Sequence, residues 1–144
     1  MKAVLQYRAS LGFRGQINAS VQDWLKVVVV EEADKVTFAD EMNNADVLLH
    51  VLEQVTADVI DAAPQLRLIQ KIGVGVNTID LEAARSHNVA VCNMPGTNSR
   101  AVAELTLTLM LAALRRVAYF DPRMRAGEGW TADIEAFDEL GEIA

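Results

Sequence analysis

The residues best suited to chemistry in this chain form a glycine turn, Gly73-Val74-Gly75, between a short apolar run and a helical pattern. Backbone N–H groups that no side chain shields can bind anions where a strand ends and a helix follows. We therefore expect the N–H groups of Val74 and Gly75 to bind a small carboxylate. A purely structural turn, with positive φ at one of the glycines, is the alternative interpretation.

The same turn departs from the dinucleotide-binding fingerprint. That fingerprint, Gly-x-Gly-x-x-Gly, needs a third glycine so that the helix can pack closely against the strand. Thr78 stands at this position. The sequence therefore predicts that this chain by itself holds no cofactor, and no cluster of His, Cys and carboxylate residues has the spacing of metal ligands.

Two polar residues are candidates for contact with a substrate. His50 ends an apolar run, at the edge where open α/β sheets place their ligands. Asn98 follows a Pro-Gly pair at the start of a long helical pattern. Each has a structural alternative: a histidine at a strand end is often only a hydrogen-bonded structural residue, and Asn98 or Ser99 can simply cap the helix.

Three further residues are expected to be structural. Glu104 lies within an apolar helical pattern, so a hydrogen bond is expected for it and not acid or base catalysis. His87, near a helix end, is expected to contact the helix carbonyls. Cys92 lies in an apolar run and is expected to be buried and inert. As the single cysteine, it has no partner for an intramolecular disulfide, which suits a cytoplasmic protein.

Short apolar runs with little polar alternation predict buried parallel strands. They cover residues 2–6, 26–30, 46–50, 67–72 and 89–92. Between them the sequence predicts helices over 38–44, 57–63 and 81–87, capped by Thr37, Thr56 and Asp80, and a less clear helix from about Ser20, with Gly12 and Gly15 in a loop. This alternation predicts an α/β fold: a three-layer doubly wound parallel five-stranded sheet, flavodoxin-like, with strand order 2-1-3-4-5.

The long helical pattern from about Ser99 to Phe120 differs from the others because its apolar residues surround the helix, which must then be buried on most sides. Asp121-Pro122 is expected to begin a further helical turn. Beyond it, Ile134, Phe137 and Leu140 are spaced as on one face of a short helix. We therefore expect a core over 1–97, a long crossover helix over 98–121, and a C-terminal segment over 122–144 packing on the same domain.

Length and charge limit the classes of partner. The chain has 144 residues, enough for one domain with a sizeable core, and a net charge of −7. This charge opposes binding to nucleic acid or to anionic membranes. The N-terminal apolar run is too short for a signal peptide, and no run approaches the length of a membrane span. We therefore expect a small-molecule partner, neither nucleic acid nor membrane.

The motifs between Gly73 and Glu104 resemble the N-terminal substrate-binding (catalytic) domain of the D-isomer-specific 2-hydroxyacid dehydrogenases, which include phosphoglycerate dehydrogenase. The resemblance rests on Gly73-Val74-Gly75-Val76-Asn77 with Ile79-Asp80, on Pro95-Gly96 with Asn98 and Ser99, and on Val102-Ala103-Glu104. It implies a flavodoxin-like domain, with NAD as the cofactor of the full-length family. It also implies that the amides of Val74 and Gly75 hold the substrate carboxylate, that Asn98 donates to substrate, and that Val102 packs against the nicotinamide.

The resemblance further implies that the catalytic His, Glu and Arg and the cofactor loop lie in a nucleotide-binding domain, before which this chain is truncated. No catalytic residue is then expected in this chain, which would be inactive alone. The alternative is a stand-alone flavodoxin-like module that binds small carboxylates. In phosphoglycerate-specific relatives an Arg-Ser pair usually follows the third strand, whereas His50-Val51-Leu52 stands here, which argues against a phosphorylated substrate.

Truncation before the second domain would leave one side of the long helix exposed, and this predicts self-association. We expect a homodimer through residues 99–120, with exchange of this helix between subunits as one form of it, because residues 93–97 could serve as a hinge. The alternative is a monomer in which Ile134, Phe137 and Leu140 fold back over the helix.

Overall fold

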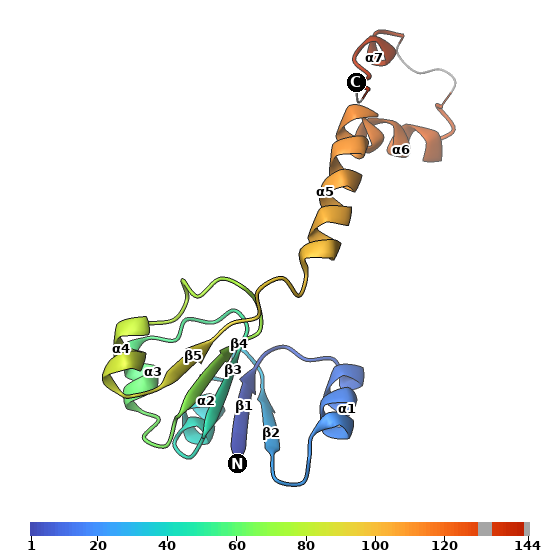
Figure 1. Cartoon of the computed structure of the whole chain (residues 1–144). Coiled ribbons are helices and arrows are strands. Elements are labelled where there is room, and N and C mark those ends of the chain that lie inside the picture. Colours follow the sequence, from blue (N-terminus) through green and yellow to red (C-terminus); the bar gives the residue numbers. More distant parts are fainter. Residues whose placement is uncertain (130–133, 143–144) are drawn as a thin grey trace. The chain divides into compact units, whose positions relative to one another are not determined.

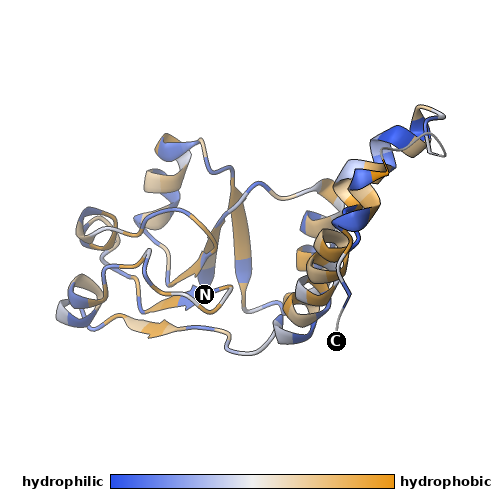
Figure 2. Ribbon diagram, turned by 90° about the horizontal axis from the view of Figure 1, so that it is seen from above, coloured by the Kyte–Doolittle hydropathy of each residue, from blue (hydrophilic) through white to orange (hydrophobic). Residues whose placement is uncertain are grey.

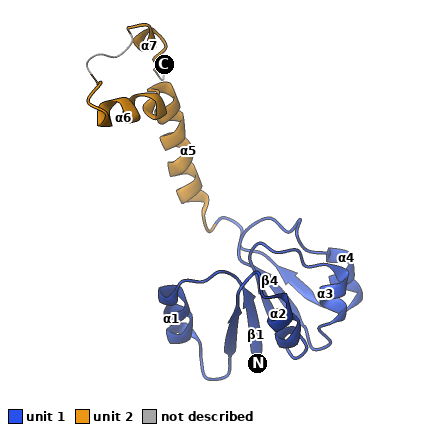
Figure 3. Ribbon diagram, turned by 180° about the vertical axis from the view of Figure 1, so that it is seen from behind, with its two compact units in different colours: residues 1–96 blue, residues 97–144 orange. Residues whose placement is uncertain are grey.

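The computed structural model describes residues 1–129 and 134–142 (Figure 1). The chain divides into two compact units, residues 1–96 and 97–144, shown in different colours in Figure 3. The boundary lies one residue before that predicted for the core.

The first unit is built on a five-stranded parallel sheet with the order β2-β1-β3-β4-β5, which confirms the predicted topology. Because parallel neighbours need crossover connections, a helix follows each of the first four strands. The strands are β1 (Lys2–Gln6), β2 (Lys26–Val30), β3 (Val47–His50), β4 (Leu68–Lys71) and β5 (Ala90–Cys92), and the helices are α1 (Leu11–Ser20), α2 (Lys35–Met42), α3 (Ala57–Asp61) and α4 (Leu81–Ser86).

The core lies between one face of this sheet and helices α2, α3 and α4. Val4, Leu48 and Ile69 stand side by side in the register of β1, β3 and β4, and each is at most 1% exposed. Helix α2 contributes Met42 and α3 contributes Ile60 to the same cluster. The apolar strands thus form the core that supports the loops at the carboxyl edge of the sheet.

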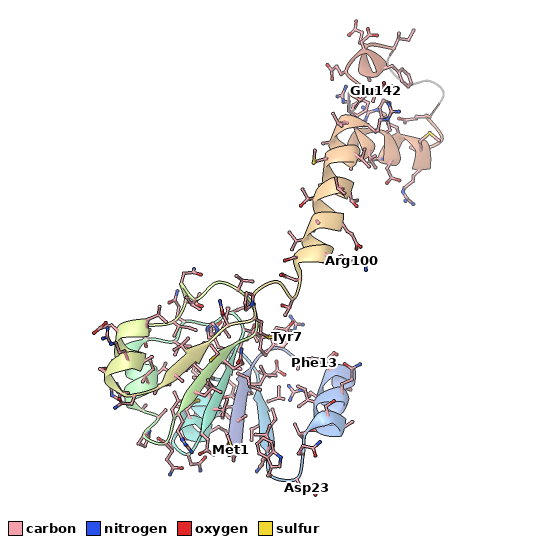
Figure 4. The ribbon with its side chains drawn as sticks, in the orientation of Figure 1. Met1, Tyr7, Phe13, Asp23, Arg100 and Glu142 are labelled. Atoms are coloured by element: carbon pink, nitrogen blue, oxygen red, sulfur yellow. The ribbon has the colours of Figure 1, made fainter. Side chains whose placement is uncertain are left out.

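Helix α1 lies beside β2 and has no buried residue. The expected loop with Gly12 and Gly15 is wrong, because both glycines lie within α1, and the helix expected from about Ser20 ends there. Ser10 caps α1 by accepting a hydrogen bond from the Phe13 N–H at 3.2 Å. The ring of Phe13 packs edge-on against Tyr7, with centroids 6.2 Å apart (Figure 4). The cap and this contact offset the low helix propensity of glycine.

The predicted caps are partly confirmed. Asp80 caps α4, accepting from the Ala83 N–H at 2.9 Å. Asn88, a residue type that tolerates the left-handed conformation, adopts it just after this helix, with φ of 57°. For α2 the prediction is wrong: Asp34 is the cap, and it accepts from the N–H of Thr37 at 3.0 Å. The helix therefore starts at Lys35, one turn earlier than predicted. Thr56 occupies the cap position of α3, but its side chain makes no capping hydrogen bond.

The second unit contains α5 (Ser99–Leu114), α6 (Val117–Arg125) and α7 (Glu135–Asp138). The single helix expected over 98–121 is interrupted, because Arg116 adopts a left-handed conformation with φ of 48°. Two contacts of Arg116 accompany this kink: its guanidinium forms an ion pair with the distant Glu139 and lies 4.6 Å from the centroid of the neighbouring Tyr119 ring.

The expectation that Asp121-Pro122 starts a helical turn is also wrong. Pro122 lies inside α6, and the carboxylate of Asp121 pairs with Arg125 one turn further on, at 2.9 Å. Since residues 122–144 belong to the second unit, their packing on the first stays a prediction. No helix among the described residues is long and apolar enough to span a membrane.

The C-terminal segment packs against the C-terminal end of α5 and against α6. Phe137 stacks on Phe120 with ring centroids 5.4 Å apart, and the N–H of Gly141 donates to the Leu114 carbonyl at 2.9 Å. Ile134, by contrast, is 79% exposed. Of the apolar face expected for this segment, Phe137 therefore packs against the helices, whereas Ile134 does not.

Candidate carboxylate site at the sheet edge

The candidate site of the first unit lies where β3 and β4 end side by side. His50 and Lys71 are the last residues of these strands and are partners in the parallel register. The glycine turn follows β4 at once, with Ile72 as the only residue between Lys71 and Gly73. His50, which precedes Lys71 by 21 residues (71 − 50), thus shares one edge of the sheet with Lys71 and the glycine turn.

His50 is buried, with 2% of its surface exposed. Its Nε2 lies 2.6 Å from the Glu53 carbonyl oxygen, so Nε2 carries the proton and donates to it. The Thr78 hydroxyl oxygen lies 3.3 Å from the same nitrogen. The Nδ1 atom is buried without a hydrogen-bond partner among the described residues.

Burial lowers the pKa of His50, and the charge of Lys71 lowers it further, while the hydrogen bond to Glu53 opposes the shift. The imidazole is therefore neutral at pH 7. A neutral, buried and hydrogen-bonded ring favours the structural interpretation of His50, and a contact with substrate remains a prediction.

Lys71 is a site residue that the sequence reasoning missed. Its side chain is buried to 8% exposure, and its ammonium donates to the Val51 carbonyl in the loop after β3. A buried ammonium beside a glycine turn adds positive charge where an anion is expected to bind. The sequence did contain a signal for it, because Lys71 ends an apolar strand and precedes the glycine turn by two residues.

The glycine turn is held in place by residues that follow β5. The Asn93 side-chain amide donates to the Val74 carbonyl, and the Met94 N–H donates to the Gly73 carbonyl, both at 2.9 Å. Gly73 has φ of 146°, as the structural-turn interpretation expects, whereas Gly75 has no positive φ. Asn93 is a second contributor that was missed, because its contact crosses from one strand end to the next.

The N–H groups of Val74 and Gly75 donate no hydrogen bond to any acceptor in the described part of the chain. The turn is open to solvent, since Val74 is 49% exposed and Gly75 is exposed too. Two unused N–H donors on a pinned turn, near a buried ammonium, are available to donate hydrogen bonds to a carboxylate.

Asn98 and Val102 belong to the second unit, so their expected places beside the glycine turn stay predictions. Asn98 stands at the cap position of α5, and its side chain makes no capping hydrogen bond. The structural alternative, in which the Asn98 side chain caps the helix, is therefore not what the structure shows for this residue. Val102 is 53% exposed.

The turn does not fit a dinucleotide. Helix α4 begins only at Leu81, six residues after Gly75, and Thr78 occupies the third glycine position and contacts His50. A β-carbon on Gly75 would lie 3.0 Å from the Asn77 side-chain oxygen, so this loop already folds back on itself. A pyrophosphate needs the glycine loop to lead directly into the helix. The chain has a second Gly-x-Gly segment, Gly127-Glu128-Gly129. It follows helix α6 and not a strand, so it does not match the dinucleotide-binding fingerprint either.

The remaining predictions are settled by contacts. Glu104 pairs with Arg100 at 3.0 Å, and the Nδ1 of His87 lies 2.9 Å from the Ala83 carbonyl oxygen, so both structural interpretations are confirmed. Cys92 is exposed, and its predicted burial is wrong, because β5 is the edge strand of the sheet. Within the described residues no three metal-ligand side chains lie together.

A separate hollow of about 240 Å³ lies between α2 and α3, lined mainly by apolar side chains that include Phe38, Met42 and Val59. It contains none of the predicted site residues. An apolar hollow does not stabilise a carboxylate, so we place the candidate site at the glycine turn.

Comparison with known proteins identifies the family. The family model of the D-isomer specific 2-hydroxyacid dehydrogenase catalytic domain matches residues 12–144. The D-3-phosphoglycerate dehydrogenase of Methanocaldococcus jannaschii is 39% identical over 104 residues, which are 72% of this chain and 20% of that protein. The chain thus spans about a fifth of the length of this relative.

Solved structures show the same fold. The NAD-dependent formate dehydrogenase of Staphylococcus aureus superposes with a TM-score of 0.79 at 21% identity, over 99% of this chain and 46% of that one. The 3-phosphoglycerate dehydrogenase of Entamoeba histolytica, solved with NAD+ bound, gives 0.68 at 26% identity, over 80% of this chain and 39% of that one. With 133 of its residues matched by the family model (12 to 144), the chain belongs to the D-isomer specific 2-hydroxyacid dehydrogenases and corresponds to their catalytic domain.

Proposed function

We propose that this chain is the substrate-binding part of an NAD-dependent 2-hydroxyacid dehydrogenase and that it holds the substrate carboxylate at the glycine turn. The observation that carries the proposal is the pair of unused N–H groups at Val74 and Gly75, on a turn pinned by Asn93. The family membership supplies the substrate class, since 2-hydroxyacids and their 2-oxo products share a carboxylate.

In the whole enzyme, hydride passes between the hydroxyacid and NAD. This chain's own contribution is to bind and orient: the two amides fix the carboxylate, and the buried ammonium of Lys71 biases the turn toward anions. Asn98 would donate to the substrate and Val102 would pack against the nicotinamide. His50 supports the turn through its contact with Thr78.

Weak binding of small 2-oxo and 2-hydroxy carboxylates is the first expected result. In an NMR titration with glyoxylate or D-lactate, the amides of Val74 and Gly75 should shift most. Two hydrogen bonds and one buried charge suggest a Kd of about 1 mM, equivalent to about −4 kcal/mol.

A substitution at Gly75 tests this site. The side chain in Gly75→Val would lie against Asn77 and cover the amides, so we expect binding to weaken by at least about tenfold, since about 1.4 kcal/mol suffices. Gly15→Val is the matched control, because no atom lies within 4 Å of a β-carbon there. If the largest shifts fall elsewhere in the sheet unit, or if Gly75→Val binds as tightly as the unsubstituted chain, the proposed site is wrong.

We expect no measurable NAD binding and no dehydrogenase turnover by these 144 residues alone. The physical reason is that the glycine turn lacks the loop-to-helix geometry that a pyrophosphate needs. Calorimetry with NAD, and absorbance of NADH in the presence of glyoxylate, give the measurements. Micromolar NAD affinity would contradict the assignment of this chain as the substrate-binding part.

A stand-alone carboxylate-binding module is the second candidate. The compact first unit, with its own core and its own candidate site, favours it. The gene distinguishes the two candidates: a reading frame that continues into a strand followed by Gly-x-Gly-x-x-Gly supports the dehydrogenase, and one that stops after Ala144 supports the module.

A further inference from the structure

The hollow between α2 and α3 is formed by one side of each helix, and its volume is about 240 Å³. The helices of the first unit carry hydrophobic and hydrophilic residues in turn along the ribbon (Figure 2), so each has an apolar side. Phe38 and Met42 of α2 are buried members of the core, and Val59 of α3 packs against the same core. These three side chains give the hollow an apolar floor that belongs to the stable part of the unit.

Two alanines keep the hollow open. Ala39 of α2 and Ala62 of α3 both line it, and both are exposed. A single methyl group on each helix leaves room where longer side chains normally interdigitate. An apolar cavity of about 150 Å³ admits a benzene ring, so this hollow has room for one ring or for a short branched chain.

Two charged residues contribute to the lining, and only one of them is already paired. Both Lys35 and Asp58 are exposed, which places their charges at the mouth of the hollow. The Lys35 ammonium forms an ion pair with Glu53. The Asp58 carboxylate, in the first turn of α3, has no hydrogen bond or ion pair with any described residue. A ligand anion would therefore compete with Glu53 for Lys35, whereas a ligand cation can pair with Asp58 directly.

The Gln6 side chain is a second acceptor in the lining. Gln6 ends β1 and is 6% exposed, and its Nε2 donates to the Glu32 carbonyl at 3.4 Å. Its side-chain oxygen accepts no hydrogen bond within the described part of the chain. The net charge of −7 also favours a positively charged ligand. The polar groups of the hollow thus match an N–H donor that carries a positive charge.

We propose that this hollow is a second ligand site, for a small organic cation: a primary ammonium that carries one aromatic ring or a short branched chain. The apolar body lies between Ala39 and Ala62, above Phe38 and Met42, whose ring and thioether both make favourable contacts with an aromatic ring. The ammonium pairs with Asp58 at the mouth. The site is independent of the proposed carboxylate site, because no residue of the glycine turn lines the hollow.

An NMR titration of the whole chain with 2-phenylethylammonium tests this site. We expect saturable shifts of the backbone amides of Phe38, Ala39 and Val59, with a Kd of about 1 mM, because a ligand with few atoms binds weakly. The matched ligand is 3-phenylpropionate, which has the same ring and the opposite charge. It should bind the hollow at least about fivefold more weakly. Its shifts at Val74 and Gly75 report the carboxylate site and are evaluated separately.

Two pairs of variants test the apolar body and the charge in turn. Ala39→Leu fills the hollow and should weaken binding of 2-phenylethylammonium at least about tenfold. Its control is Val36→Leu on the same helix, because Val36 is 75% exposed and does not line the hollow. Asp58→Asn should weaken binding about threefold, as expected for an exposed ion pair. Its control is Asp40→Asn, which removes the same charge from α2 outside the lining and should leave binding unchanged.

Ala39→Leu is expected to keep α2 because leucine is a good helix former, and unchanged amide shifts away from the hollow check the fold. The exposed Asp58→Asn gives a second test that does not change the packing. An absence of saturable shifts in α2 and α3 overturns the proposal, and so does equal binding of the ammonium and the carboxylate. Unchanged binding in Ala39→Leu, or equal binding in Asp58→Asn and Asp40→Asn, overturns it too.

Discussion

Ile69→Ala is expected to destabilise the sheet unit by about 2–5 kcal/mol. Ile69 of β4 is fully enclosed, with 0% exposure. It stands in register between Leu48 of β3 and Val91 of β5. Alanine at this position removes three carbon atoms from the middle of the core. Neighbouring strands cannot close the gap without breaking the ladder, so a cavity remains.

Amide hydrogen exchange of β1, β3 and β4 measures this loss for the first unit by itself. Val36→Ala is the control, because Val36 is 75% exposed on α2, and its truncation should change the free energy of unfolding by less than about 0.5 kcal/mol. Equal losses in the two variants would mean that the sheet core does not carry the stability of this unit.

Acidification below about pH 6.5 is expected to destabilise the sheet unit through His50. Its folded pKa is lowered, so the unfolded chain binds more protons than the folded chain between the ordinary pKa of about 6.5 and the lowered value. The stabilisation is thus fully present above about pH 6.5 and is lost as the pH falls. The slope stays below the one-proton limit of about 1.4 kcal/mol per pH unit.

His50→Gln should remove this slope between pH 5 and 6.5, because glutamine does not titrate. His87→Gln is the matched control: the chain has two histidines, and His87 is the exposed one, paired with Asp61 at 3.0 Å. Urea unfolding at several pH values gives the slopes. If His87→Gln removes the slope and His50→Gln keeps it, the burial of His50 is not its cause.

The order of the strands and several local features could be predicted from the sequence. Apolar runs without polar alternation specify strands covered on both faces, and Asp80 and Asn88 act on atoms three or four residues away. Such interactions depend on the neighbouring sequence alone. The same holds for the Gly73 turn, whose positive φ needs only the absence of a β-carbon.

The errors in the fold arise where local signals compete. Asp34 and Thr37 are both good cap residues for one helix. The structure uses Asp34, whose carboxylate accepts a hydrogen bond from the N–H of Thr37. The long apolar pattern continues past Leu114, yet the helix breaks at Arg116, because a cation–π contact and an ion pair with Glu139 stabilise the kink. Glu139 lies 23 residues along the chain from Arg116 (139 − 116), so no local pattern contains this information.

The sequence by itself determined the family, through its motifs, and the parallel sheet, because apolar spacing acts locally, and it predicts the glycine turn as the place for an anion. The tertiary structure alone decided what surrounds that turn. It buried His50 as a neutral ring in contact with Thr78, joined Lys71 to the Val51 carbonyl, and pinned the turn through Asn93, and each of these three contacts joins segments that follow or end different strands. It also left Cys92 exposed on an edge strand, since the exposure of a strand depends on its neighbours in the sheet and not on its own residues.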